Sequence, residues 1–107
     1  MKKYSNKCLS ILAAVGSLLL IPQAQATTLT ATQVGQAAFD VGMRGNALVD
    51  AIAIADAESS FVLEAVHNNA NGTVDRGLWQ INSIHSEYNA ALLLSSATYN
   101  AQAAYNL

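Results

Sequence analysis

The stretch Asn68-Asn69-Ala70-Asn71-Gly72-Thr73-Val74-Asp75-Arg76-Gly77-Leu78-Trp79-Gln80-Ile81-Asn82-Ser83 decides the fold of this chain of 107 residues. Its Asn71-Gly72 dipeptide is the one best suited to a two-residue hairpin turn, because both central positions of that turn need positive φ. We therefore expect segments 65–69 and 73–81 to pair as a small antiparallel ribbon.

Helices are expected on the N-terminal side of this ribbon. Thr30 or Thr32 can cap a first helix that ends near Gly42, and Asn46 can cap a second one. In that second helix, Glu58 falls in the last turn or two. One face, which we expect to pack on the core, is shared by Leu48, Ile52, Ala55 and Ser59.

The pattern turns helical again after the ribbon. Ser83 or Ser86 can start a short helix, residues 89–94 are apolar enough to pack on the core, and residues 98–105 form an Ala-rich helix. The predicted fold class is α+β, mainly α, as one helical domain with a small β-hairpin.

The first 26 residues have the features of a cleaved secretory signal. Three lysines precede an apolar core at 9–21, and Ala24-Gln25-Ala26 provides the small residues of a cleavage site. The rival interpretation, an uncleaved membrane anchor, is disfavoured because the core is shorter than the roughly 20 residues of a spanning helix. We expect a domain at 27–107 that is periplasmic or secreted and has no stable membrane anchor.

Charge and cysteine content narrow the function classes. Beyond residue 26 the chain has two arginines against seven acidic residues, a net charge of −5 with neutral histidines, and no cysteine. A nucleic-acid partner is therefore not expected, because no basic patch is available to contact phosphates. The domain must also fold without disulfides, although small exported domains often rely on them.

Two acidic residues lie 17 positions apart, Glu58 on the second predicted helix and Asp75 on the ribbon. Each alone has a simpler explanation, Glu58 as a solvated helix residue and Asp75 as a turn acid. Together, a pair of this kind can flank a glycosidic bond. Apolar neighbours of Glu58 along the chain predict a desolvated carboxyl group that keeps a proton for general acid catalysis: Ala55, Ala57, Phe61 and Val62.

Other site chemistries are weaker. Oxygen-bearing side chains alternate from Asn69 to Asp75 as in calcium loops, but no glutamate closes the loop at the usual spacing. Ser59 and Ser60 could pair with His67 or His85 as nucleophile and base, but no strand–turn–helix serine elbow surrounds them. His67 fits better as a surface residue of the ribbon, and His85 as a residue at the start of a helix. We expect no metal and no cofactor.

Three motifs together resemble the lysozyme-like superfamily, which includes animal lysozymes and bacterial lytic transglycosylases of the SLT type. Glu58-Ser59 is similar to the family's catalytic glutamate followed by serine. Gly77-Leu78-Trp79-Gln80-Ile81-Asn82 resembles its Gly-Leu-x-Gln-Ile-Asn signature, and Tyr99-Asn100-Ala101-Gln102-Ala103-Ala104-Tyr105 resembles its later Asn-x-x-Ala-Ala-Tyr helix.

The resemblance implies cleavage of peptidoglycan between N-acetylmuramic acid and N-acetylglucosamine. It implies that Glu58 is the general acid and that Asp75, aligned without a gap, is the second carboxylate, the division of roles for which lysozyme is the type case. By the same resemblance, Asn69 and Thr73 orient Asp75. The remaining residues implied to contact substrate are Ser59, Gln80 and Asn82. Trp79 fits equally as a wall of the sugar groove that contacts substrate or as a core residue.

The chain also departs from the family pattern. The aromatic pair that lines the cleft after Asn-Ser is absent, since Ile84, His85 and Ser86 stand there, and the chain ends at Leu107, inside the later helix. Three alternatives stay open: a muramidase, a lytic transglycosylase in which Glu58 acts alone, and an inactive peptidoglycan-binding module or truncated remnant. A protein partner that completes the cleft is a further possibility.

Overall fold

The computed structural model describes residues 25–107. The expected signal segment at 1–26 therefore falls almost wholly outside the described residues. The elements in chain order are α2 (Ala31–Asp40), α3 (Gly45–Ser59), β1 (Val66–Asn68), β2 (Val74–Arg76), β3 (Ile81–Asn82), α4 (Ala90–Ser95) and α5 (Ala97–Asn106). The predicted fold class, α+β and mainly α, is confirmed.

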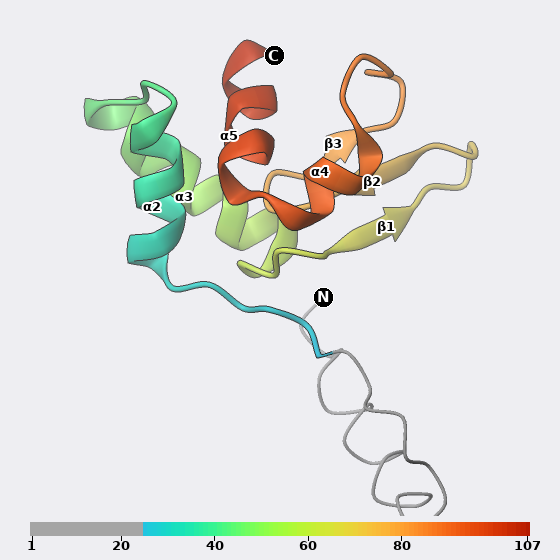
Figure 1. Ribbon diagram of the computed structural model, residues 1–107, viewed down its shortest axis with the longest axis horizontal. Coiled ribbons are helices and arrows are strands. Elements are labelled where there is room, and N and C mark those ends of the chain that lie inside the picture. Colours follow the sequence, from blue (N-terminus) through green and yellow to red (C-terminus); the bar gives the residue numbers. More distant parts are fainter. Residues whose placement is uncertain (1–24) are drawn as a thin grey trace, which may run out of the picture.

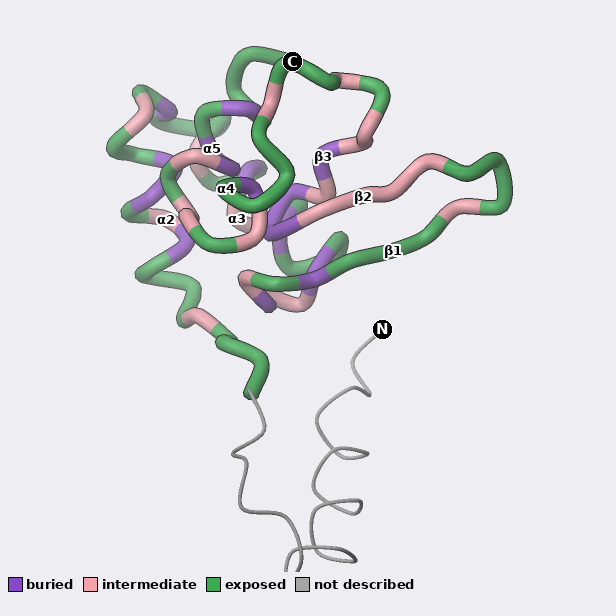
Figure 2. The backbone as a smooth tube through the Cα atoms, turned by 45° about the vertical axis from the view of Figure 1, so that its right-hand side comes forward, coloured by how far each residue is buried: buried purple, intermediate pink, exposed green. Residues whose placement is uncertain are grey.

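Helices α2, α3 and α5 form one side of the molecule, the sheet extends from the other, and α4 lies beside the sheet (Figure 1). Helix α2 contacts α3 and α5, while α4 and α5 also contact β2 and β3, respectively. Buried segments gather where the helices meet and along the β2–β3 connection, whereas the tip between β1 and β2 is exposed (Figure 2). Within residues 25–107, no helix is long and apolar enough to span a bilayer.

The first helix begins where its capping residue predicts. Thr30 Oγ1 accepts from the backbone N–H of Gln33, and the Gln33 side chain accepts from the N–H of Thr30, which forms a capping box. The predicted cap at Asn46 is wrong, because α3 already begins at Gly45. Gly45 takes a φ of 58°, a conformation that costs glycine little, so the chain reverses one residue earlier.

The predicted helix start at Ser83 or Ser86 is also wrong. Residues 83–88 form turns, and α4 starts only after Asn89, whose Oδ1 accepts from the N–H of Leu92. The reason lies in the sheet, because Ser83 Oγ accepts from the N–H of Val74 and is not free to cap a helix. His85 accordingly lies between two turns and not at a helix start. Helix α5 matches its prediction within one residue at each end.

The sheet has three strands in the order β1-β2-β3, one more than the predicted ribbon. The segment expected as one strand at 73–81 is divided by a turn in which Gly77 has a φ of 80° and Gln80 a φ of 52°. The hairpin turn differs too. The N–H of Asn69 donates to the carbonyl of Thr73, so the loop closed by this pair holds three residues, 70–72, instead of the two expected; within it, Gly72, with φ of 91°, donates to the carbonyl of Asn69.

A buried asparagine connects this strand turn to the last two helices. Asn100 is fully buried in α5, accepts from the N–H of Trp79 at 2.9 Å, and donates to the carbonyls of Arg76 and Leu93 at 3.0 Å. A Cβ at Gly77 would overlap the Asn100 amide and the Leu93 carbonyl. The close contact therefore requires glycine at 77 and fixes β2 and β3 against the helical core.

Candidate active site

Asp75 lies in the middle of the sheet and its carboxylate is held from both sides. Its Oδ2 accepts from Asn69 Nδ2 at 3.1 Å, and its Oδ1 accepts from Asn82 Nδ2 at 2.7 Å. Asn82 stands directly opposite Asp75 on β3, as His67 does on β1. Since opposite residues share a face of an antiparallel sheet, these side chains present one polar surface with Asp75 at its centre.

Thr73 connects the two asparagines that hold this carboxylate. Its Oγ1 accepts from Asn69 Nδ2 at 3.0 Å and from Asn82 Nδ2 at 3.1 Å, and it donates to Asn71 Oδ1 at 2.7 Å. Asn71 Oδ1 also accepts from the N–H of Thr73 at 3.0 Å. The hydroxyl is thus fully used within the sheet, and it fixes the directions in which both amide groups point.

Asn82, expected to contact substrate, is engaged in positioning Asp75 in this structure. Besides its two donated hydrogen bonds, its Oδ1 accepts from the N–H of Ile84 at 3.0 Å. Asn71 was not among the expected site residues. An asparagine side chain that accepts from the backbone N–H two residues later forms a common turn motif. That motif could have indicated that Asn71 helps to orient Thr73.

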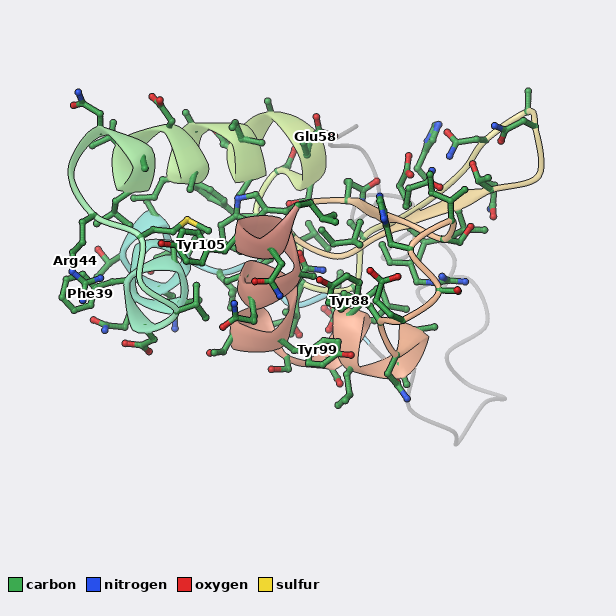
Figure 3. The ribbon with its side chains drawn as sticks, turned by 90° about the horizontal axis from the view of Figure 1, so that it is seen from above. Phe39, Arg44, Glu58, Tyr88, Tyr99 and Tyr105 are labelled. Atoms are coloured by element: carbon green, nitrogen blue, oxygen red, sulfur yellow. The ribbon has the colours of Figure 1, made fainter. Side chains whose placement is uncertain are left out.

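Glu58 occupies the last turn of α3, as predicted, at the end of the helix nearest the sheet (Figure 3). Its side chain is exposed among the described residues, so the prediction that apolar neighbours desolvate its carboxyl group is wrong. Ala55 and Ser59, on the same part of the helix, are fully buried. Phe61 lies instead beside the N-terminal segment, where its carbonyl accepts from the N–H of Leu29 at 2.9 Å.

The chain makes a strained reversal directly after Glu58 and Ser59. Ser60 and Phe61 have φ values of 54° and 64°, in the left-handed region that bulky residues rarely adopt. Directly after the reversal, residues 61 and 63 form backbone hydrogen bonds with residues 29 and 27. The segment that leads from Glu58 toward the sheet is therefore paired with a short N-terminal segment.

Two of the residues expected to contact substrate lie in the core. Ser59 is fully buried and its Oγ donates to the carbonyl of Ala55 at 2.9 Å. Trp79 is 8% exposed, and its Nε1 donates to the carbonyl of Ala51 at 2.9 Å. The Ser59 bond lies within α3, whereas the Trp79 bond ties the β2–β3 turn to α3, which is a positioning role.

Gln80 also acts within the β2–β3 turn. Its Nε2 donates to the carbonyl of Gly77 at 2.9 Å and to that of Ala65, just before β1, at 3.2 Å. The left-handed conformation of Gln80 is therefore compensated by its own side chain. Through this contact, the turn between β2 and β3 is fixed to the start of β1.

An apolar groove of about 330 Å³ lies between α3 and α5, away from both carboxylates. Tyr105 extends from α5 along this side of the molecule (Figure 3). The groove is lined by Met43, Ala47, Asp50, Ala51, Ile54, Trp79, Ala104 and Tyr105. Across residues 25–107, no three or more histidine, cysteine or acidic side chains are grouped as metal ligands would be.

The family assignment rests on most of the helical region and on the whole sheet. A family model described as a lysozyme like domain matches residues 35–107, from within α2 through α5. The chain belongs to the lysozyme-like domain family. Membership connects this lysozyme-like chain, in general terms, to peptidoglycan and to the glycosidases and lytic transglycosylases that act on it. No curated protein matches the chain.

Asn100 has a positioning role in this lysozyme-like chain that its sequence does not indicate. In the sequence it is only one member of a helical motif that resembles the family. Its signal is weak, because an asparagine in an Ala-rich helix is more often exposed. Only the meeting of α5 with the β2–β3 turn shows that its amide satisfies three backbone groups.

Proposed function

We propose that this lysozyme-like chain cleaves the glycosidic bond between N-acetylmuramic acid and N-acetylglucosamine in peptidoglycan, in the periplasm or after secretion. Glu58 protonates the glycosidic oxygen. Asp75 faces the anomeric carbon and either stabilises the developing oxocarbenium ion or attacks it. The glycan strand lies across the end of α3 and the Asp75 face of the sheet.

The observation that carries this proposal is the arrangement around Asp75. Each of its two oxygens accepts from an amide nitrogen, and both amides are themselves oriented by Thr73. Such an arrangement holds a carboxylate in one direction before substrate arrives, which is what stabilisation of a transition-state charge requires. A carboxylate with a purely structural role would be expected to pair with a cation or cap a helix.

Glu58 has to hold a proton when the leaving group departs. In the free protein it is exposed. In this mechanism the bound sugar therefore excludes water from the Glu58 carboxyl group. A protein partner bound beside α3 would shield the rest of that group from solvent. Desolvation of this kind raises the pKa of a carboxyl group in general and makes it an effective acid near neutral pH.

Two chemical outcomes follow from the same site. If Asp75 and a water complete the reaction, the products carry reducing muramic ends and the protein is a muramidase. If Glu58 acts as acid and then as base, a hydroxyl of the substrate attacks instead and leaves anhydro-muramyl ends, as in a lytic transglycosylase. The exposure of Glu58 favours one non-enzymatic alternative, a module that binds the glycan without cleaving it.

Mass spectrometry of fragments released from purified peptidoglycan separates these outcomes. Residues 27–107 and the Glu58→Gln variant are compared at equal concentration, with circular dichroism as a check that both are folded. Release by the unaltered chain alone supports the proposal, and the chemistry of the muramic end chooses hydrolase or transglycosylase. Equal release by both proteins rejects Glu58 as the acid. Binding of both to insoluble peptidoglycan without any release supports the binding module.

A further inference from the structure

The backbone nitrogen of Thr27 lies 2.7 Å from Glu64 Oε1, a contact that joins two residues 37 positions apart. Thr27 is also the residue that directly follows the expected cleavage site Ala24-Gln25-Ala26. Both residues of the contact are exposed. In the uncleaved chain this nitrogen belongs to an ordinary peptide group, which offers one neutral N–H to the carboxylate.

The contact lies at the end of a short backbone pairing. The N–H of Leu63 donates to the carbonyl of Thr27 at 2.9 Å, the N–H of Leu29 donates to the carbonyl of Phe61 at 2.9 Å, and Thr28 forms a β-bridge with Val62. The N-terminal segment is thus paired with 61–63. That segment leads from the strained reversal after Glu58 into β1.

We propose that removal of the leader between Ala26 and Thr27 creates an ion pair between the new N-terminus and Glu64. A leader peptidase uses one water to hydrolyse the peptide bond, so Ala26 leaves with a carboxylate and the Thr27 nitrogen becomes an ammonium group. The neutral contact with Glu64 then becomes a charge-assisted hydrogen bond, which is the stronger type. The inference requires the expected leader cleavage but not the proposed enzymatic activity.

The charge of the domain favours this pairing. Residues 27–107 carry two arginines against seven acidic side chains, so a new positive charge meets a strongly negative protein. The ammonium group also has three N–H donors and can contact the carboxylate without breaking the backbone pairing of Thr28 and Leu29. Cleavage therefore strengthens the attachment of the N-terminal segment to residues 61–64, which lead from the end of α3 toward the sheet.

The first test uses the full chain, exported from a cell with a secretory pathway. Mass spectrometry of the product should show a chain that begins at Thr27. A product that begins at any other residue would overturn the inference, because its terminal nitrogen would not lie at Glu64.

The second test uses a property of the exported sequence: residues 27–107 contain no lysine, so the α-amine is their only primary amine. Acetylation with an amine-selective reagent should lower the Tm by about 2–5 °C, the size expected for loss of one surface ion pair in a small domain. In Glu64→Gln, which keeps an acceptor oxygen but no charge, acetylation should change the Tm by less than about 1 °C.

Glu87→Gln is the matched control, because it removes an exposed carboxylate elsewhere in the chain. Acetylation should lower its Tm as much as in the unaltered protein, and the effect should shrink as salt screens the pair. An equal effect of acetylation in Glu64→Gln and Glu87→Gln would overturn the ion pair. These readouts are independent of peptidoglycan cleavage, so failure of one proposal is distinguishable from failure of the other.

Discussion

Asn82 Nδ2 donates a 2.7 Å hydrogen bond to Asp75 Oδ1, and the two residues stand directly opposite each other on β3 and β2. The register of these two short strands therefore decides whether the carboxylate is held. A slip of one residue would turn Asn82 to the other face of the sheet. The turn at Gly77 and Gln80 and its contact with Asn100 set that register.

Replacement of Asn82 by alanine should lower the rate of peptidoglycan cleavage by about 10- to 100-fold, because Asp75 loses one of its two orienting donors. Release of soluble fragments over time measures this effect. Asn68→Ala is the matched control, since Asn68 is an exposed asparagine on β1 opposite Val74. A similar loss in both variants would show that the effect comes from the sheet as a whole and not from Asp75.

The replacement Asp75→Asn separates the two enzymatic mechanisms. It keeps the side-chain shape but removes the charge that would stabilise an oxocarbenium ion. A muramidase should lose more than about 100-fold in rate, since preorganised charge is a large catalytic contribution, whereas a transglycosylase that uses Glu58 alone should retain most of its activity. The chemistry of the released muramic ends, measured on the same samples, has to agree with the rate result. Disagreement between the two would reject this assignment of Asp75.

Gly77→Ala should destabilise the protein by more than about 4 kcal/mol and prevent stable folding at 37 °C. The added Cβ would overlap the Asn100 amide and the Leu93 carbonyl, and the residue also has a φ of 80°. Gly72→Ala has a similar φ of 91° but open space around its Cβ, so it should cost only about 1–2 kcal/mol. Urea unfolding followed by the fluorescence of Trp79, the single tryptophan, compares them. Equal losses would contradict the close packing at Gly77.

Asn100→Ala should cost about 3 kcal/mol or more, because it leaves the N–H of Trp79 and the carbonyls of Arg76 and Leu93 without their partner. Asn106→Ala, on the same helix but exposed, should change stability by less than about 0.5 kcal/mol. Thermal unfolding measures both. A small effect at Asn100 would mean that water replaces its amide, and that the β2–β3 turn does not depend on it.

Local sequence signals predicted those elements whose ends are fixed by neighbouring residues. The first helix begins at the Thr30 cap because both partners of the capping box lie within four residues of sequence. The starts of α3 and α4 could not be predicted in this way. Gly45 reverses the chain before Asn46 can act as a cap, and Ser83 is occupied by the N–H of Val74 nine residues away.

In the candidate site, too, features set by nearby residues were predictable and features set by packing between elements were not. Asn69, Thr73 and Asp75 alternate along the chain and meet on one face of the sheet, so their association was predictable from spacing and family resemblance. The exposure of Glu58 and the burial of Trp79 were not, because each depends on which neighbouring elements cover that side chain. A pattern along one helix does not show what packs against it.

The sequence by itself determined the mainly helical α+β class, the hairpin around Gly72, the family, and the two carboxylates that we assign to catalysis. These follow from periodicity, turn chemistry and short motifs, all of which act over a few residues. Only the tertiary structure decided that Asn82 orients Asp75, that Asn100 fixes the strand turn, and that Thr27 meets Glu64. Each of these contacts joins two different elements or segments, and it forms only when they pack together.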